Sequence, residues 1–317
     1  MKPNEPHSWS VEGLLAKAQV YMDQMDSTSP DDWRYGLWSA LSLEFLAKAA
    51  LANVSPLLLA DPHKWQNLLY AIGRDPTERK FTPKSIGAME VIARLGDLIP
   101  EFNPELAGFC KTHIARRNAE LHSGEAAFYG LGTSAWLPWF YKACKVLLEA
   151  LGRDLGDFFS APEQADDMIA SLNDAAAKAV EKEIEDRKQA WFERSEEERH
   201  VYHQQATSWA SSRDGHRVEC PACSSPALLY GHPTGPVSRS VGPDLVEERQ
   251  SMLPSVFECV ACGLKIVGYS KLSACGLGDV FNSKTSYTAA NFFGLYTEDE
   301  LEQARSEIPD FEPDFNE

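Results

Sequence analysis

The chain has 317 residues, of which 44% are hydrophobic, and a formal net charge of −17 at pH 7. This length allows a sizeable buried core and two domains, whereas the acidic charge argues against electrostatic steering to bulk nucleic acid. No apolar run approaches the ~18 residues of a membrane span, and the polar, proline-containing start is not typical of a signal peptide. We therefore expect a soluble, cytoplasmic protein.

The first 160 residues predict an all-α domain, because apolar residues recur there at helical spacing. Thr82 before Pro83 and Asn103 before Pro104 each place a capping side chain ahead of a proline at the first helical position. The predicted helices cover residues 8–26, 29–56, 63–73, 82–100, 103–124 and 136–152. No strand pattern precedes residue 152, so we expect a helical bundle over residues 1–160.

Residues 161–212 are rich in Ala, Glu and Lys and predict one long linking helix. Its apolar residues form a single stripe, made of Ile169, Leu172, Ala176, Val180, Ile184 and Trp191. Such a helix can pack on the bundle or on a second chain. A connecting helix with a solvated acidic face is the favoured interpretation, and a specific binding face is the alternative.

Residues 213–284 combine β-type runs with two cysteine pairs and predict a zinc ribbon. Cys220 and Cys223 (CPAC) are separated by 35 residues from Cys259 and Cys262 (CVAC). Four thiolates in two close pairs suit a tetrahedral Zn²⁺, and Gly263 permits a tight turn after the second pair. The alternatives are two unrelated thiol pairs or a redox CxxC, which would accompany a βαβ unit that this sequence lacks. The remaining thiols, Cys110, Cys144 and Cys275, are interpreted as free or buried.

The role of the ribbon is less well defined by its sequence. Residues 213–284 carry seven basic and seven acidic residues. This balance favours a structural or protein-docking ribbon over a ribbon that binds nucleic acid.

Residues 285–317 form an acidic tail with a net charge of −8, and its end alternates aromatic and acidic residues around two prolines. The tail could bind a protein partner or regulator, or mimic RNA and cover an active site.

The stretch ARRNAELHSGE, residues 115–125, is the candidate for chemistry in the helical domain. Arg117 and His122 are separated by about 500° of helix rotation, so their side chains diverge by roughly 140°. Asn118 and His122 lie on one face of the helix, and an arginine is long enough to reach the same phosphate. The alternative is an ordinary helix end, in which His122 meets the helix dipole before a Gly124 cap. A similar spacing, Arg194 to His200, lies among glutamates that would repel a phosphate.

Residues 117–122, RNAELH, resemble the R-x(4–6)-H signature of the HEPN superfamily, with a polar residue directly after the arginine. The segment LEFLAKAAL, residues 43–51, resembles the early core helix of that family. The resemblance covers about residues 8–155 and leaves the ribbon and tail outside. It implies a homodimer in which two motif helices face each other and form one composite site. It also implies a metal-independent endoribonuclease of toxin or antiviral-defence type that is restrained until it is triggered.

In that reading, the 2′-OH of RNA is the nucleophile and no catalytic metal is needed. His122 acts as a general acid or base, and Arg117 stabilises the charge that develops on the phosphorane. Asn118 holds the phosphate or orients His122. Arg116 and His113 flank the site and are interpreted as solvated side chains, with RNA contact as the alternative.

Glu44 is four residues before Lys48 on the early helix. The pair is either a surface ion pair or a support in which Glu44 positions Arg117.

Two other functions stay open. The main alternative is a non-catalytic HEPN-like adaptor, which would bind RNA or dock protein partners through the zinc ribbon and the acidic tail. A zinc-ribbon DNA-binding regulator is disfavoured, because the sequence shows no helix-turn-helix with a basic recognition helix.

Overall fold

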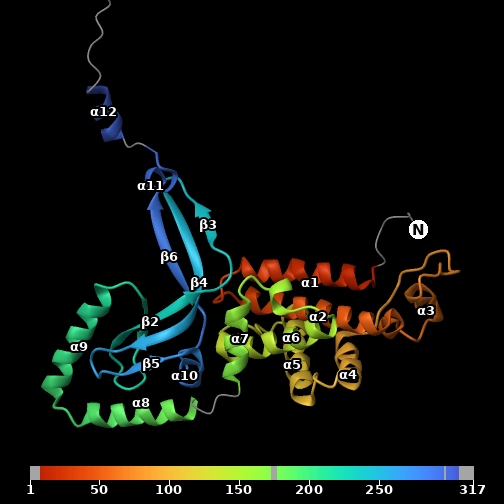
Figure 1. Cartoon of the computed structure of the whole chain (residues 1–317), viewed down its shortest axis with the longest axis horizontal. Helices are drawn as coiled ribbons and strands as arrows, with labels where there is room; N and C mark the ends of the chain where they lie inside the picture. Colours follow the sequence, from red (N-terminus) through yellow and green to blue (C-terminus); the bar gives the residue numbers. More distant parts are fainter. Residues whose placement is uncertain (1–7, 173–176, 296–297, 307–317) are drawn as a thin grey trace, which may run out of the picture.

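The computed structural model describes residues 8–172, 177–295 and 298–306. Its first part is a helical bundle, shown at the right of Figure 1. The bundle helices are α1 (Val11–Asp26), α2 (Trp33–Val54), α3 (Trp65–Ala71), α4 (Ala88–Leu98), α5 (Pro104–His122), α6 (Leu137–Ala150) and α7 (Pro162–Ser171). Short 3-10 turns follow α2 (Pro56–Leu59), precede α6 (Thr133–Ala135) and follow α6 (Leu155–Asp157). The prediction of a mainly helical fold with a smaller β part is confirmed at this level.

Capping side chains set three of the seven helix starts of the bundle, those of α1, α2 and α5. The Ser10 side chain accepts a hydrogen bond from the backbone N–H of Gly13, and the Asn103 side chain accepts one from Leu106, directly before Pro104. Asp32 caps α2 by accepting from the backbone N–H of Arg34. Of these three caps, Asn103 is the predicted one, whereas α2 begins at Trp33, four residues after its predicted start at residue 29.

The predicted helix over residues 82–100 begins later than expected. The structure starts α4 at Ala88, and the Thr82 cap is wrong. Residues 84–86 instead pair with residues 59–61: the backbone N–H of Asp61 donates to Lys84, and that of Ile86 donates to Leu59. These contacts hold the segment extended, so a tertiary pairing overrides the local helix-start signal.

Helix α2 is the central helix of the bundle. It is the one described helix that is long and apolar enough, by length and composition, to cross a membrane. In the structure its apolar residues Leu43, Leu46 and Leu51 are fully buried, and it packs against α1, α4, α5 and α6. Its apolar character is therefore used for the core of the bundle.

The single long helix predicted for residues 161–212 is wrong. The structure divides this segment into α7, α8 (Ala177–Phe192) and α9 (Glu196–Ser211). Ser195 starts α9 with a reciprocal capping box, in which its side chain accepts from the Glu198 backbone and the Glu198 carboxylate accepts from the Ser195 backbone. The predicted apolar stripe also divides: Ile169 packs on the bundle core, whereas Val180 and Trp191 are buried in the second core. Ala176 lies outside the described residues.

The second part is an antiparallel sheet with short helices. Its strands are β1 (His216–Glu219), β2 (Pro226–Pro233), β3 (Ser238–Val241), β4 (Leu245–Glu258), β5 (Lys265–Val267) and β6 (Phe281–Thr288). The 14-residue strand β4 is central: β2 and β3 pair along it in succession, as do β5 and β6, and β1 pairs with β2. Helix α10 (Tyr269–Ala274) lies between β5 and β6 in sequence and packs against α7 and α8.

The boundary placed at residue 284 falls inside β6. This strand continues to Thr288, because residues 281–288 pair in unbroken register with residues 252–245 of β4. The predicted acidic tail therefore begins with strand residues, followed by α11 (Ala289–Phe293) and α12 (Glu298–Ser306), neither of which has buried residues. Residues 307–317 of the predicted tail lie outside the described residues.

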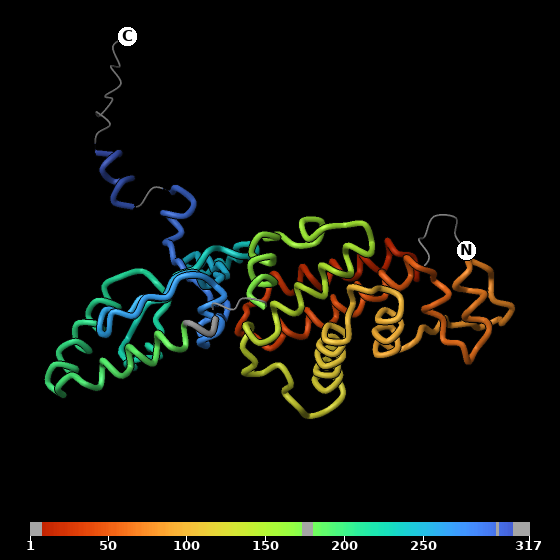
Figure 2. Tube along the Cα trace, turned by 60° about the horizontal axis from the view of Figure 1, so that its bottom comes forward, coloured from red at the N-terminus to blue at the C-terminus, as the bar shows by residue number. Residues whose placement is uncertain are grey.

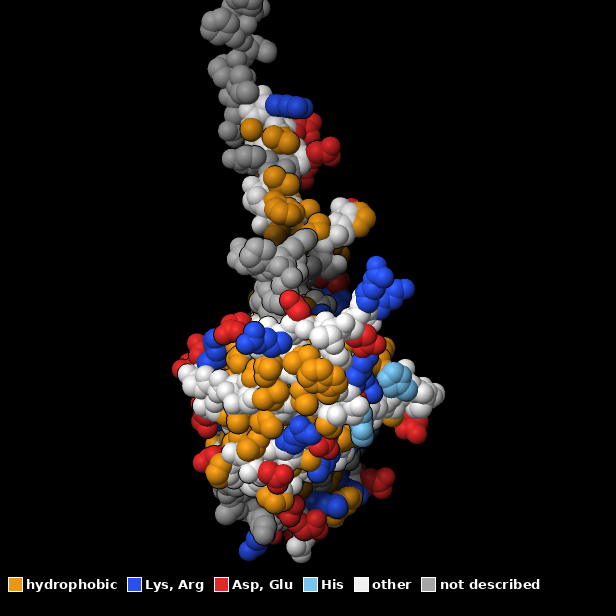
Figure 3. Space-filling model, turned by 90° about the vertical axis from the view of Figure 1, so that its right-hand side faces the viewer, with side chains coloured by type: hydrophobic (Ala, Val, Ile, Leu, Met, Phe, Trp, Pro, Cys, Tyr) orange, Lys and Arg blue, Asp and Glu red, His pale blue; other side chains and the backbone are white. Residues whose placement is uncertain are grey.

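The bundle and the β domain lie side by side and share a core (Figure 2). Leu253, Tyr269 and Val280 of the β domain are buried in the same apolar cluster as the bundle residues. At the opposite end of the bundle, where α3 lies, hydrophobic side chains gather on the surface (Figure 3). Trp65, Leu68 and Ile72 are among the exposed apolar side chains of this region.

Candidate functional site

The four cysteines of the two CxxC pairs lie together and are buried. Their Sγ atoms all lie within 4.8 Å of one another. The Sγ atoms of Cys220 and Cys262 are 3.6 Å apart, as are those of Cys223 and Cys259. A disulfide would need about 2.05 Å, whereas a tetrahedral Zn²⁺ with ~2.3 Å bonds to sulfur needs about 3.8 Å between sulfurs. The cluster is therefore consistent with zinc binding.

The two cysteine turns have the same backbone construction. The backbone N–H of Ser224 donates to the Cys220 carbonyl at 2.9 Å, and that of Gly263 donates to the Cys259 carbonyl at 3.0 Å. Each turn ends in a left-handed residue, with φ of 55° at Ser224 and 73° at Gly263. Ser224 is the one non-glycine residue with positive φ in the part of the chain that the structure describes. Its side chain disfavours this conformation, which Gly263 adopts freely.

Replacing Ser224 by glycine should therefore stabilise the first turn. We expect Ser224→Gly to raise the free energy of unfolding of the zinc-loaded protein by about 0.5 to 1 kcal/mol. Gly263→Ala, at the equivalent position, should lower it instead. Urea denaturation of both variants beside the wild type measures the two changes, and a destabilising Ser224→Gly would show that the Ser224 side chain is itself needed.

Helices α8 and α9 hold the cysteine turns from outside. The Arg194 guanidinium donates to the Ala261 carbonyl at 3.0 Å, inside the second turn, and lies over the rings of Trp191 and Tyr202. On the first turn, His203 Nδ1 lies 3.2 Å from the Ser225 hydroxyl. Arg194 thus supports the second cysteine turn, which gives this arginine a structural role.

The three other thiols lie apart from the cluster. Burial raises the pKa of the Cys110 thiol to about 12 and also raises the pKa of Cys144. Cys275 is half-buried, and its thiol donates to the Leu272 carbonyl at 3.3 Å. Neutral, largely buried thiols of this kind act as small apolar side chains.

Helix α5 carries the motif residues at its C-terminal end. The buried residues Leu106, Cys110 and Ile114 form a stripe along the helix, and Arg117 follows on the same side, three residues after Ile114. Arg117 is therefore half-buried, with 14% of its side chain exposed. His122 leaves the stripe and is exposed at the last helical residue.

Glu44 of α2 meets Arg117 across the helix interface. One carboxylate oxygen, Oε2, accepts from the Arg117 guanidinium, while Oε1 accepts from Lys48 Nζ at 2.7 Å. The Glu44 and Lys48 side chains are only 12% and 14% exposed, so the alternative of a surface ion pair is wrong. Burial lowers the pKa of both Arg117 and Lys48, and the shared carboxylate compensates for their desolvation.

The structure does not join all predicted site residues. No hydrogen bond or ion pair links His122 to Arg117 or Asn118 among the described residues, and Asn118 and Arg116 are half-buried. The predicted Gly124 cap is also wrong: α5 ends at His122 and its C-cap is Ser123, whose extended backbone donates to the Ala119 carbonyl at 2.9 Å. One chain thus presents a fixed Arg117 and a separate, exposed His122.

His113 is not solvated, and that interpretation is wrong. The side chain is fully buried, with its ring stacked on Trp136 at 5.0 Å and on Phe109 at 5.3 Å. It faces inward because it lies three residues after Cys110, on the buried stripe of α5. The Ser39 hydroxyl donates to the Gly36 carbonyl at 2.7 Å and lies 2.8 Å from His113 Nε2. Nε2 thus has a polar neighbour, whereas Nδ1 is buried without a hydrogen-bond partner.

The burial of His113 predicts a pH dependence of stability. Burial, with a smaller contribution from Arg116, lowers the pKa of His113 to about 3 from its ordinary 6.5. In the unfolded chain His113 becomes protonated near pH 6.5, whereas in the folded protein it stays neutral until about pH 3. Acidification from pH 6.5 towards 3 therefore favours the unfolded chain and should lower the free energy of unfolding by up to about 1.4 kcal/mol per pH unit. His113→Phe keeps the aromatic packing and should weaken this dependence.

Urea denaturation of wild type and His113→Phe at pH 7 and pH 5 measures the difference. Asp26, whose pKa burial raises to about 6, stabilises the fold on acidification, but it is present in both proteins and cancels in the comparison. Equal pH dependence of the two proteins would show that His113 is not the acid-sensitive group.

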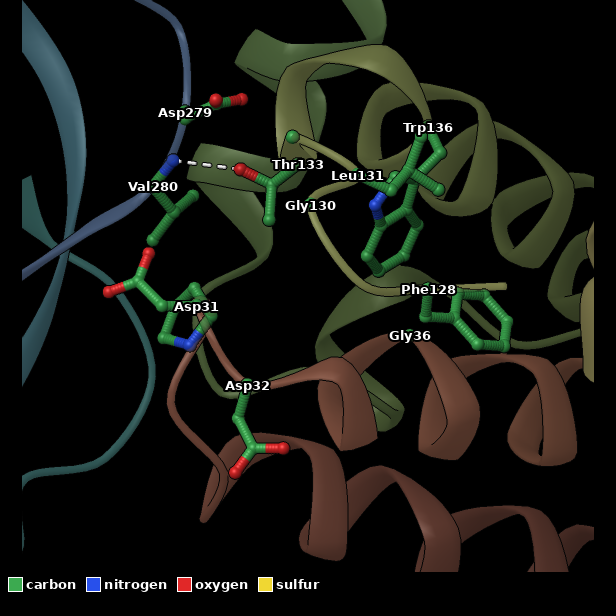
Figure 4. Close-up of a pocket in the computed structure, with 12 residues that line it drawn as sticks. Asp31, Asp32, Gly36, Phe128, Gly130, Leu131, Thr133, Trp136, Asp279 and Val280 are labelled. Atoms are coloured by element: carbon green, nitrogen blue, oxygen red, sulfur yellow. Dashed lines mark hydrogen bonds between the residues drawn. The ribbon is translucent and has the colours of Figure 1, made fainter. Parts of the chain in front are cut away.

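The loop after the motif helix is fastened to the β domain, a contact that the sequence pattern did not reveal. The Thr133 hydroxyl accepts from the backbone N–H of Val280 at 2.8 Å (Figure 4). The backbone N–H of Ser134 donates to the Asp279 carboxylate at 2.8 Å. A Cβ at Gly132 would lie 2.6 Å from that carboxylate, so a larger residue at this position would displace the Asp279 side chain. A cavity of about 240 Å³ lies here, and its lining includes Pro30, Asp31, Gly36, Phe128 and Trp136.

Comparison with known proteins adds no assignment: no family model, no curated protein and no solved structure matches this chain.

Proposed function

We propose that the protein is a metal-independent endoribonuclease of the HEPN type, acting in a toxin or antiviral-defence role. The observation that carries this proposal is the Glu44–Arg117 contact. It holds a guanidinium from one side near the end of α5, five residues before the exposed His122. A supported arginine and an accessible histidine are groups that suit RNA cleavage through the 2′-OH, with a facing chain bringing the two types of side chain together.

The reaction moves two protons and exchanges one bond. One imidazole takes the proton of the 2′-OH, whose oxygen forms a bond to phosphorus. The bond from phosphorus to the 5′-oxygen breaks, and that oxygen receives a proton from an imidazolium. Arg117 stabilises the charge on the non-bridging oxygens, and its rigid fork suits their geometry. The products carry a 2′,3′-cyclic phosphate and a 5′-OH.

This reaction needs an acid and a base, and each chain supplies one His122. A homodimer with facing α5 helices brings the second histidine into the same site. Side chains beside the motif support such a contact, since Leu121 and Tyr129 are 48% and 80% exposed. Large apolar side chains at this exposure are often covered by a partner.

The four-cysteine cluster is assigned a structural Zn²⁺. Four protein ligands leave no open position for water or substrate, which is the pattern of structural rather than catalytic zinc. The ion would hold the two turns of the β domain, and RNA cleavage would proceed without it.

A metal-free cleavage assay with a chimeric substrate tests the proposed chemistry. Purified protein, its zinc content verified, is incubated with end-labelled RNA in buffer stripped of free divalent cations. We expect cleavage that leaves cyclic or 3′-phosphate ends, and no cleavage at a site whose 5′-side nucleotide is replaced by its 2′-deoxy form. Cleavage of the deoxy position, or products with 5′-phosphate ends, would contradict 2′-OH attack.

A second candidate function is a non-catalytic adaptor. The exposed side chains Trp65, Leu68 and Ile72 at the α3 end of the bundle favour it, because such a group is typical of a protein-docking surface. The two functions differ in the role of His122: an adaptor would not need it, and an adaptor would cut no RNA.

A further inference from the structure

A groove of about 930 Å³ opens on the β domain, away from the motif residues. One wall is the segment that enters β1, residues 213–217, and the other is β6, residues 281–286. Leu229, Tyr230 and Met252 contribute to its lining from β2 and β4. The groove thus lies where β1 and β6 border the central part of the sheet.

The charge of the groove differs from that of the chain as a whole. Arg213, Arg217 and Lys284 line it with a single acidic residue, Asp214, whereas the whole chain has a net charge of −17. Lys284 forms an ion pair with Glu247. Arg213 and Arg217 are exposed, and neither forms an ion pair with a carboxylate among the described residues.

These two arginines are held by neutral contacts. Arg213 lies over the Trp209 ring at 5.6 Å, and the Arg217 guanidinium donates to the Ser211 carbonyl at 3.2 Å. Their remaining donors are free for an anion. Arg213 and Arg217 thus face one carboxylate in the lining, Asp214, and Asp31 of the bundle lies nearby, 3.4 Å from Asn282 Nδ2.

An aromatic platform lies beside the arginines. The exposed His216 ring stacks on the largely buried Phe281 ring, with centroids 4.5 Å apart and planes 17° from parallel. Partial burial lowers the pKa of His216, against an opposing effect of Asp31. The ring is thus a flat surface, fixed by Phe281 at the wall of the groove. Asn282 and Ser283 place polar side chains along β6 next to it.

We propose that this groove binds single-stranded RNA, with phosphates against Arg213 and Arg217 and a base stacked on His216. A basic channel beside an aromatic face is a combination that binds single strands. Each base offers a ring that can stack, and each phosphate linkage carries a negative charge. A duplex keeps its bases paired and offers no free ring. The choice of RNA over DNA rests on the proposed ribonuclease function, for which the groove would hold the strand outside the cleavage site.

Fluorescence anisotropy with a labelled ten-nucleotide oligouridylate tests this proposal, using the full chain with His122→Ala so that nothing is cut. Single strands release counterions with a salt slope of ~0.7 per phosphate contact. Arg213→Ala/Arg217→Ala should therefore lower the slope of log affinity against log salt by about 1.4 and weaken binding about 25-fold at 0.1 M salt. His216→Ala should weaken binding with an unchanged slope.

The matched control is Arg74→Ala/Arg79→Ala, which removes the same charge from two exposed positions of the bundle. This variant should bind like the His122→Ala parent. Groove variants that bind as well as the control would overturn the proposal, and equal competition by the deoxy oligomer would overturn the assignment to RNA. Because binding is measured without His122, a failure here and a failure of cleavage are distinguishable.

Discussion

Replacing Cys223 by serine should remove the zinc and unfold the β domain. Binding of structural zinc to four cysteine or histidine ligands contributes roughly 10 kcal/mol or more of folding free energy at neutral pH. The second core of the protein is built around this cluster, since Cys220, Cys223, Cys259 and Cys262 are part of its buried residues. Loss of one thiolate leaves the zinc ion with three of its four sulfur ligands. The two cysteine turns of the β domain are then no longer joined through the ion.

The bundle should survive this change, because most of its core comes from α1 to α7. Zinc content, together with limited proteolysis followed by mass spectrometry, measures both effects. We expect cleavage within residues 213–288 and protection of residues 8–160. Cys275→Ser is the matched control: its thiol lies in the same domain but outside the cluster, so zinc and protection should be retained. A Cys223→Ser protein that keeps its zinc and its protease resistance would contradict the assignment.

The second large effect is expected at Glu44. In Glu44→Gln, Arg117 and Lys48 lose their shared carboxylate and stay close together in a half-buried interface. Removing one member of a buried ion pair costs about 3 to 5 kcal/mol. Because these side chains keep some exposure, we expect a loss of about 2 to 4 kcal/mol in the free energy of unfolding. RNA cleavage should fall as well, since Arg117 is no longer held.

Two further variants separate charge from packing. Glu44→Gln/Lys48→Met removes the repulsion between the two cations and should recover part of the lost stability. Glu90→Gln breaks the ion pair with Arg94 on α4, where the Glu90 side chain is 55% exposed, and should cost less than about 1 kcal/mol. Urea denaturation measures all three. If Glu44→Gln costs no more than Glu90→Gln, the Glu44 contact is not a support for Arg117.

The four-cysteine cluster could be predicted from the sequence because the spacing within each pair is local and each pair forms one turn. The start of α5 could be predicted for the same reason, from Asn103 and Pro104. The break before α9 had a readable signal, the capping box of Ser195 and Glu198, which the continuous apolar stripe concealed. The late start of α4 had none, because it depends on pairing with residues 59–61.

The candidate sites depend on tertiary contacts that spacing does not define. Helical periodicity places His113 on the same side as Cys110, but its burial is decided by Trp136 and Phe109. Likewise, Glu44 was a candidate partner of Arg117, and only the packing of α2 against α5 brings them together. The basic groove was missed because residue counts average over a domain, whereas a binding surface depends on where each charge lies.

The most direct measurement for the central claim is single-turnover cleavage of mixed cellular RNA by the wild type, His122→Ala and His200→Ala. His200 is also exposed on a helix, but it lies on α9, outside the motif. We expect wild type and His200→Ala to cut at equal rates, and His122→Ala to lose at least about 100-fold, the lower range for removing a general acid or base. If His122→Ala cuts as fast as the other two proteins, His122 is an ordinary helix end and Arg117 to His122 is not the active site.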